Sequence, residues 1–225
     1  MPINLYAESI AVGNRIFVAG GDSPLIDNVY EIDIKTCTLI EKAHLLRKTH
    51  HFSLCNANDY IYLVGGELPK ESHSSDCEKY SISLNKWTFL PKLLAEEIIN
   101  AAVFTIKNAT LFVIGGYCGK QGGNINSMEK LNILKPTKWE YVTVKNVFSG
   151  RTSIQAYPIN VNEVIVFGGC TPECYVLTIG DVVECREEVG QMAHLGNFCC
   201  TAASVCDGRH IYGVDRAEYS LLLNS

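Results

Sequence analysis

The sequence carries little charge of either sign and no large cluster of it. Its 225 residues include 19 Lys or Arg and 24 Asp or Glu, which gives a formal net charge of −5. The basic residues are scattered, and the pair Arg47 and Lys48 is their most concentrated group. Proteins that bind nucleic acids gather Lys and Arg on one face. The charge pattern therefore excludes nucleic acid from the expected partners.

Long hydrophobic runs are also missing. No apolar stretch approaches the ~20 residues that a membrane-spanning helix needs, so we expect no membrane insertion. The first residues have neither the basic nor the apolar region of a signal peptide. Pro2 stands where myristoylation requires a glycine. These features predict an intracellular, cytoplasmic protein.

The ten cysteines lack the spacing of a metal site, because none form a C-x-x-C pair. Disulfides are disfavoured in a protein that is not secreted. We therefore expect free thiols that are mostly buried and behave as small apolar residues. Cys118, Cys170 and Cys174, in predicted loops, are the candidates for a redox-responsive thiol.

Recognisable catalytic patterns are absent as well. No Ser, His and Asp order suggests a nucleophile site, and the glycine-rich segment 115–123 lacks the spacing of a phosphate-binding loop. His50 and His51 are adjacent on a predicted strand, where neighbours point to opposite faces. A structural or surface role is therefore expected for them. The sequence predicts no catalytic residue, no metal site and no cofactor.

What the chain does contain is a repeat. Four times a short apolar strand runs into a double glycine, and the pairs begin at positions 20, 65, 115 and 168, about 45 to 53 residues apart. The pairs are Gly20 and Gly21, Gly65 and Gly66, Gly115 and Gly116, and Gly168 and Gly169. Short β-branched and aromatic runs around them predict about four strands per unit. Helical periodicity is limited to residues 93–99, which could form a turn or two.

Aromatic residues recur in these units. A second apolar stretch after the glycines carries Tyr30, Tyr80 and Tyr175 in three units, and Trp87 and Trp139 follow in two. We expect the large rings to fill the space between neighbouring units.

The units differ at several of these positions. Leu131 replaces the Tyr in the third unit, Cys37 stands at the Trp position of the first, and Val182 or Val183 at that of the fourth. A fifth, degraded unit covers residues 194–223 and has lost its glycines.

The combination of double glycine, Tyr and Trp on a period near fifty resembles the kelch repeat. The resemblance implies an all-β, kelch-type β-propeller, in which four-stranded antiparallel blades bury both faces by packing around an axis. It covers the whole chain as a single domain, residues 1–225. The expected repeats are approximately 1–44, 45–93, 94–147, 148–190 and 191–225.

Four complete units and a fifth of three strands predict about five blades. We expect residues 2–6 to supply the missing strand beside residues 218–223. If the termini lie far apart instead, the chain is an incomplete six-bladed ring.

The resemblance also implies where a partner binds. In such propellers the loops between second and third strands, and those that link blades, line one mouth of the channel. Family members often place an Arg in the linking loop, where Arg47 and Arg151 match and Glu97 stands in the third unit. Arg suits a carboxylate or phosphate on a peptide; the alternative is that it ties blades through backbone carbonyls. Tyr117 and Gln121 are the expected loop contacts.

Three functions remain open. The first is a non-catalytic module that binds a partner protein or peptide on the loop face. The resemblance implies an adaptor, a substrate receptor among ubiquitin-ligase components, or a contact with the actin cytoskeleton. The second is a small-molecule binder or enzyme that uses the channel, which predicts converging His, Cys, Glu or Tyr side chains at one mouth. The third is a degenerate scaffold with little binding of its own.

Overall fold

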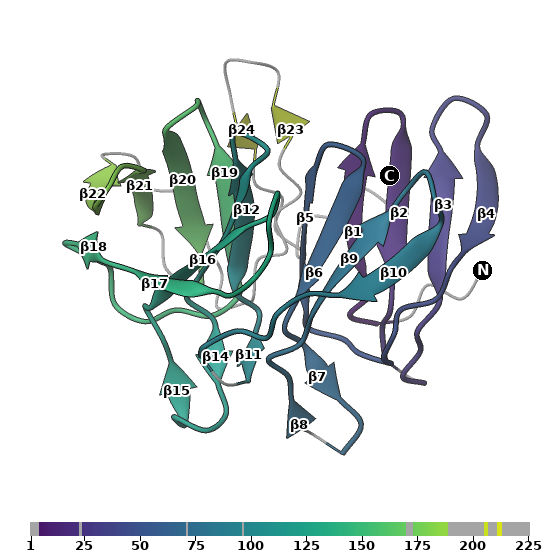
Figure 1. Ribbon diagram of the computed structural model, residues 1–225, viewed down its shortest axis with the longest axis horizontal. Coiled ribbons are helices and arrows are strands. Elements are labelled where there is room, and N and C mark those ends of the chain that lie inside the picture. Colours follow the sequence, from purple (N-terminus) through teal and green to yellow (C-terminus); the bar gives the residue numbers. More distant parts are fainter. Residues whose placement is uncertain are drawn as a thin grey trace, which may run out of the picture.

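The computed structural model describes residues 5–22, 24–70, 72–95, 97–169, 173–188, 205–206 and 211–212. Within these residues every regular element is a β-strand. Figure 1 shows the strands gathered in sheets that stand side by side around a common axis. The first strands of successive sheets contact one another along this axis. The all-β, propeller-like arrangement predicted from the repeat is confirmed.

Four sheets contain four antiparallel strands in the order of the chain. We call them blades 1 to 4. Blade 1 comprises β1 (Glu8–Val12), β2 (Arg15–Ala19), β3 (Val29–Asp33) and β4 (Thr38–Lys42). Blade 2 comprises β5 (Ser53–Ala57), β6 (Tyr60–Val64), β9 (Cys77–Ser81) and β10 (Lys86–Phe89). Blade 3 comprises β12 (Ala102–Ile106), β13 (Thr110–Ile114), β16 (Met128–Asn132) and β17 (Glu140–Val142). Blade 4 comprises β19 (Ile154–Pro158), β20 (Glu163–Gly168), β21 (Cys174–Thr178) and β22 (Val183–Glu188).

Blade 4 gains a strand that the repeat did not predict. Strand β18 (Val144–Lys145), from the segment that leaves blade 3, pairs with β22 in parallel. The outer edge of blade 4 is therefore covered by chain from its neighbour, which reduces the exposed row of unpaired backbone groups.

The loops between second and third strands carry short strands of their own. In blade 2 they are β7 (Glu67–Leu68) and β8 (Ser72–His73). In blade 3, β14 (Tyr117–Cys118) and β15 (Gly123–Asn124) pair with β11 (Ile98–Ile99) from the linker that enters the blade. Both hairpins project from the same end of the blades (Figure 1). We call this end the loop face.

The fifth unit is represented by β23 (Val205–Cys206) and β24 (Ile211–Tyr212), which pair with each other. The strand expected from residues 2–6 and its predicted partner, residues 218–223, lie mostly or wholly outside the described residues. Leu5, which is described, forms an isolated bridge with Asp22 of blade 1.

The helical turn predicted for residues 93–99 is wrong for the residues that the structure describes there. The amide of Leu93 donates to the Ser75 carbonyl (3.0 Å), and that of Ile98 to the Ser74 carbonyl (3.2 Å). The amide of Leu94 donates to the Glu129 carboxylate (2.8 Å). Because these amides are bonded to neighbouring segments, they are not available for helical bonds.

The core lies between blades. One cluster fills the space between blades 1 and 2, with Phe17, Phe52 and Tyr80 among its members. A second lies between blades 2 and 3, and a third between blades 3 and 4. Each inner blade therefore buries apolar side chains on both of its faces, which a single blade could not do.

The two tryptophans join neighbouring blades. The Trp87 indole donates to the Ala43 carbonyl at the end of blade 1 (2.9 Å), and the Trp139 indole to the Pro91 carbonyl after blade 2 (2.8 Å). Both side chains are buried. Trp87 lies on β10, as predicted, whereas Trp139 directly precedes β17.

The tyrosines of the third strands do not all occupy equivalent positions. Tyr80 lies opposite the fourth residue before its double glycine, whereas Tyr30 and Tyr175 lie opposite the second. Tyr30 and Tyr175 thus occupy the position of Glu78 in blade 2, and matching them to Tyr80 was wrong. The error arose because the loops that precede the third strands differ in length, so sequence spacing does not fix the register.

The double glycines bring the backbone of one blade against the next. Both glycines of each pair have positive φ. A Cβ on Gly65 would collide with the Ile98 carbonyl oxygen at the entry to blade 3. The Gly66 amide donates to the same oxygen (3.0 Å). Gly65 is therefore needed both for its φ of 69° and for the space it leaves.

Gly65→Ala should reduce the free energy of unfolding by about 3 kcal/mol or more, because it combines backbone strain with a steric clash between blades. Gly13→Ala is the matched control, since Gly13 has a φ of 60° and open space where the Cβ would lie. The control should cost about 1–2 kcal/mol, from strain alone. Guanidinium unfolding followed by far-ultraviolet circular dichroism measures both, and equal losses would contradict the proposed contact.

Candidate functional site

The site is built on the linkers that enter the blades at the loop face. The linkers into blades 2 and 3 each start with a buried leucine whose amide bonds to the preceding blade. The Leu45 amide donates to the Asp27 carbonyl (2.8 Å), as the Leu93 amide does to Ser75. Because the same backbone bond recurs, the two linkers begin at equivalent positions relative to the preceding blade.

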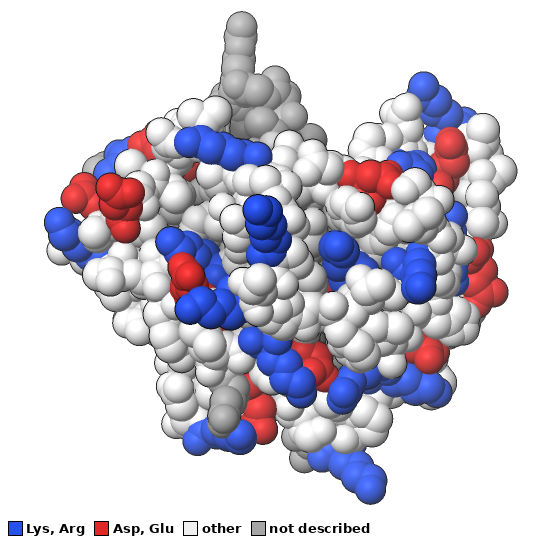
Figure 2. Space-filling model, viewed as in Figure 1, with Lys and Arg blue, Asp and Glu red and all other residues white. Residues whose placement is uncertain are grey.

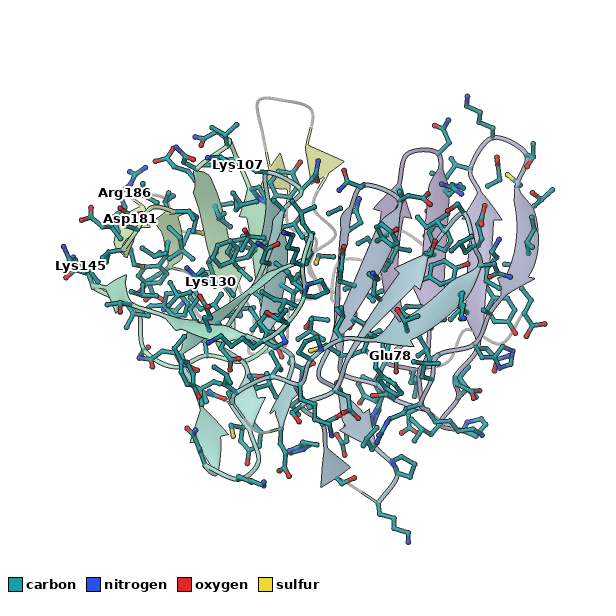
Figure 3. All side chains as sticks on the ribbon, viewed as in Figure 1. Glu78, Lys107, Lys130, Lys145, Asp181 and Arg186 are labelled. Atoms are coloured by element: carbon teal, nitrogen blue, oxygen red, sulfur yellow. The ribbon has the colours of Figure 1, made fainter. Side chains whose placement is uncertain are left out.

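Two buried glutamates hold the residues that follow. Glu78 accepts the Leu46 amide (3.0 Å), and Glu129 accepts the amides of Leu94 and Ala95 (2.8 and 2.6 Å). Figure 3 shows Glu78 near the end of the blades from which the β7–β8 hairpin projects. Burial raises the pKa of Glu78 to about 7 and also raises the pKa of Glu129, against the effect of the amide bonds.

Each linker then passes through one residue in the left-handed region. These residues are Tyr6, His51, Asn100 and Ser153, with φ between 52° and 60°. They lie one or two residues before the innermost strands. The last three are bonded in sequence: the Asn100 amide donates to the His51 carbonyl (3.0 Å) and the Ser153 amide to that of Asn100 (2.8 Å). They lie beside the first strands, which contact one another around the axis, and we call this place the mouth. Non-glycine residues adopt this conformation rarely.

The residue before each of these pairs with the residue after a double glycine. The pairs are Leu5 with Asp22, His50 with Glu67, and Ile99 with Tyr117. Asp22, Glu67 and Tyr117 therefore occupy equivalent positions at the mouth.

In blade 2 this frame brings three titratable side chains together. His50, His51 and Glu67 each place a potential ligand atom within 4.8 Å of the others. The expectation that His50 and His51 point to opposite faces was wrong, because the φ of 54° at His51 breaks the alternation of an extended strand. Their ring centroids are 4.5 Å apart. Sequence reasoning missed this cluster, since one left-handed residue decides it.

The neighbours of the cluster complete its environment. The Tyr6 ring lies 4.4 Å from the His51 ring. The Nδ1 atom of His50 lies 3.4 Å from the Glu67 carbonyl oxygen, and its Nε2 lies 3.9 Å from a carboxylate oxygen of Asp22. Burial and the adjacent His50 ring lower the pKa of His51.

Arg47 lies at the surface beside other exposed groups. Its side chain is 44% exposed, its Nε is 2.9 Å from Asp76, and its guanidinium lies over the Phe89 ring. Lys92 binds the other Asp76 oxygen at 2.9 Å. Phe89 itself is 53% exposed. We call Arg47, Phe89 and Lys92 the Arg47 patch.

Arg151, in contrast, is buried. Its guanidinium donates to the Glu173 carbonyl and carboxylate (3.3 and 3.1 Å) and to the Tyr175 hydroxyl (3.1 Å). It also lies over the Phe148 and Tyr175 rings. The alternative role was that the Arg ties adjacent blades through backbone carbonyls. Arg151 instead fastens its linker to the blade that the linker enters, through one carbonyl and two side chains.

The two arginines are not at equivalent positions. The carbonyl of Arg151 accepts the amide of the second glycine of blade 3 (2.7 Å). In the linkers of blades 2 and 3 that role belongs to Thr49 and Ile98. Arg47 lies two residues before Thr49, so matching it to Arg151 by distance from the glycines was wrong.

Tyr117 and Gln121 lie on the β14–β15 hairpin. The Tyr117 ring is half-buried and meets the His73 ring of the β7–β8 hairpin edge to face, with centroids 5.8 Å apart. Gln121 is exposed between β14 and β15. Lys120 lies 3.9 Å from Glu97 of the linker. The two hairpins thus meet at the loop face, with Gln121 accessible.

Six cysteines have described side chains and form no disulfide, and among these six Cys37 alone is exposed. Cys118 and Cys174 lie buried on strands, and burial raises the pKa of Cys174. Because both are buried, they differ from the accessible thiols that react readily. Cys170, the third redox candidate, lies outside the described residues.

The surface shows no large patch of one charge sign on the face seen in Figure 2, where Lys and Arg are interspersed with Asp and Glu. In the described part of the chain no helix is long and apolar enough to cross a membrane.

Comparison with known proteins places the chain. A family model for the kelch motif matches residues 48–94, which span blade 2. Blade 2 therefore carries a kelch motif, within an all-β, propeller-like fold. It is 26% identical over 152 residues to Kelch repeat and BTB domain-containing protein 2 of cowpox virus, with 64% of this chain and 27% of that protein covered. It is also 26% identical over 144 residues to Kelch-like protein 25 of Xenopus laevis, with 60% and 24% covered.

A solved structure, titled "Structure of YjhT", supports the fold. It superimposes with a TM-score of 0.72 over 87% of this chain and 68% of its own, at 11% identity. At that identity the likeness concerns the fold alone. The chain spans about a quarter of the length of the curated relatives named here.

Arg151 is buried and Arg47 is exposed, so their substitution by Ala should reduce the free energy of unfolding by different amounts. Arg151→Ala should reduce the free energy of unfolding by about 3 kcal/mol, because it removes a buried cation with three polar bonds. Arg47→Ala should cost about 1 kcal/mol or less, since its ion pair is half-exposed. Urea unfolding of both variants measures this, and similar losses would contradict the assignment.

The raised pKa of Glu78 predicts a pH-dependent stability. The pKa rises from 4.5 to about 7 on folding, so the folded chain keeps a proton that the unfolded chain releases across that window. Stability should therefore fall as the pH rises between these values, by about 3 kcal/mol in total. Urea unfolding at about pH 5 and about pH 8 should show a loss that is smaller in Glu78→Gln than in the wild type by about 3 kcal/mol. A residual loss is expected in Glu78→Gln, because burial also raises the pKa of Glu8 and of Glu129. Glu140→Gln, at an exposed site, should keep the wild-type dependence.

Proposed function

We propose that this chain is a non-catalytic interaction module that binds a partner protein or peptide on its loop face. The observation that carries the proposal is the Arg47 patch, in which the Arg47 guanidinium lies over the exposed Phe89 ring. The guanidinium of Arg47 and the ammonium of Lys92 share Asp76 as their counter-charge. The patch is therefore both apolar and net positive.

This chemistry selects a class of partner. An apolar or aromatic anchor suits the exposed Phe89 ring, and an acidic group beside it suits the two cations. We therefore propose a segment with an apolar residue next to Asp, Glu or a phosphorylated residue. Tyr117 and Gln121 provide further contacts on the neighbouring hairpin, while Arg151 holds its linker in place rather than touching the partner.

The family supports a binding role. Kelch-repeat proteins commonly mediate protein–protein interactions, and relatives of this chain combine kelch repeats with a BTB domain. We propose an adaptor role in the cytoplasm, with ubiquitin-ligase components or the actin cytoskeleton as the candidate assemblies.

The cluster at the mouth favours a second candidate function. The second function left open by the sequence, a small-molecule site in the channel, requires His, Cys, Glu or Tyr side chains to converge at one mouth. His50, His51, Glu67 and Tyr6 do so. The two functions use different residues, so substitutions separate them.

The test is capture of partners from cell lysate with the wild-type chain, followed by calorimetry with the purified partner. Arg47→Ala combined with Phe89→Ser should weaken binding at least about tenfold, as expected for a patch that anchors the interface. Tyr117→Ala with Gln121→Ala tests the hairpin contacts in the same way.

Lys107→Gln is the matched control, because Lys107 lies at the opposite end of the blades (Figure 3). It should bind as the wild type does. Equal binding by all these variants would overturn the loop-face proposal. A loss confined to His51→Asn would favour the site at the mouth, and the absence of any partner would favour a degenerate scaffold.

A further inference from the structure

The cluster at the mouth has the chemistry of a metal site. Two imidazoles and a carboxylate, from His50, His51 and Glu67, converge within 4.8 Å. Imidazole nitrogen and carboxylate oxygen together form a donor set that zinc takes with three protein ligands and one open position. We propose that His50, His51 and Glu67 bind a divalent transition-metal ion, with zinc as the physiological candidate. This site is independent of the Arg47 patch.

The backbone holds the three ligands in place. The His50 amide donates to the Glu67 carbonyl (3.2 Å), and the Glu67 amide donates to the His50 carbonyl (2.7 Å). The left-handed turn at His51 then directs its ring to the same side as that of His50. Tetrahedral bonds of about 2.1 Å place ligand atoms ~3.4 Å apart. Binding therefore requires the three side chains to rotate toward one another, and all three are only half-buried in the linker and the adjoining loop.

The surrounding groups suit a ligand role for His50. A hydrogen bond from Nδ1 to the Glu67 carbonyl (3.4 Å) leaves the lone pair on Nε2. Such a bond from the second nitrogen is the usual support of a metal-binding histidine. Nε2 faces Asp22 of blade 1 at 3.9 Å. A metal ion bound to Nε2 of His50 would therefore lie close to the Asp22 carboxylate.

The equivalent positions in other blades show that the fold does not require this donor set. The three positions hold Leu5, Tyr6 and Asp22 in blade 1, and Ile99, Asn100 and Tyr117 in blade 3. Side chains that do not form this donor set, such as those of Leu5, Ile99 and Asn100, are therefore compatible with the same backbone frame. Among the described residues, the donor cluster of this frame is confined to blade 2.

The test is a titration of the full chain, prepared without a polyhistidine tag and with its thiols reduced. Co²⁺ is the probe, because its visible absorption reports the coordination geometry and the ligand type. We expect one Co²⁺ per chain, bound with the spectrum of nitrogen and oxygen ligands and displaced by Zn²⁺. Mg²⁺ should not displace it, since imidazole is a poor ligand for that ion.

Two variants assign the site. His51→Asn keeps a residue that tolerates positive φ, as Asn100 does at the equivalent position with a φ of 52°. Glu67→Gln keeps the shape of the side chain. Each should weaken Co²⁺ binding at least about tenfold while the circular dichroism spectrum stays unchanged. His44→Ala removes a half-exposed histidine of blade 1 and should leave the affinity within about twofold of the wild type.

Three results would overturn the proposal. The first is no Co²⁺ binding by the folded wild type. The second is a sulfur-to-cobalt charge-transfer band, which would assign the ion to cysteines. The third is binding that His51→Asn and Glu67→Gln leave unchanged. Each is distinguishable from failure of the loop-face proposal, which is measured on other residues and with a protein partner.

Discussion

The close approach of each double glycine to the linker of the next blade is the contact on which the rest of the structure depends. In blades 1 to 3 the amide of the second glycine donates to a linker carbonyl, at Thr49, Ile98 and Arg151. Because a Cβ at the first glycine would meet that linker, the distance between blades is set by backbone and not by adaptable side chains. The same backbone contact fixes the position of each of these linkers along the axis.

This contact at the mouth is balanced by a second contact farther along each blade. The indoles of Trp87 and Trp139 bond to the chain leaving the preceding blade. Glu78 and Glu129 then fasten the linker between these two points. A blade is thus joined to its neighbour at several places along its length, and the interblade cores fill the space between them. The loops inherit a rigid frame, which is what precise binding requires.

The sequence predicted the features that repeat as the same residue type in each unit. It did not predict the features that depend on backbone conformation or on loop length. The double glycines predicted the ends of the second strands, and the tryptophans predicted contacts between blades. The register of Tyr30 and Tyr175 could not be predicted, because it depends on the length of the preceding loops. The side chains of His50 and His51 were predicted to lie on opposite faces, as neighbours on a strand do. The left-handed conformation of His51 breaks this alternation. Nor could spacing distinguish the exposed Arg47 from the buried Arg151, since a difference of two residues in a linker changes the surroundings entirely.

At the mouth, the backbone conformation is the same from blade to blade while the side chains differ. Tyr6, His51, Asn100 and Ser153 share one backbone conformation, and the positions beside them share one pairing, yet their side chains differ in every blade. Since the backbone bonds tolerate these differences, selection can change the chemistry of the mouth without changing the distance between blades. Blade 2 has a cluster of two histidines and a glutamate on this frame, and it also carries Arg47 on the outer part of the same linker. His50 and His51, two of the three proposed metal ligands, follow shortly after the segment that Glu78 holds, so a change in that linker would move both surfaces together.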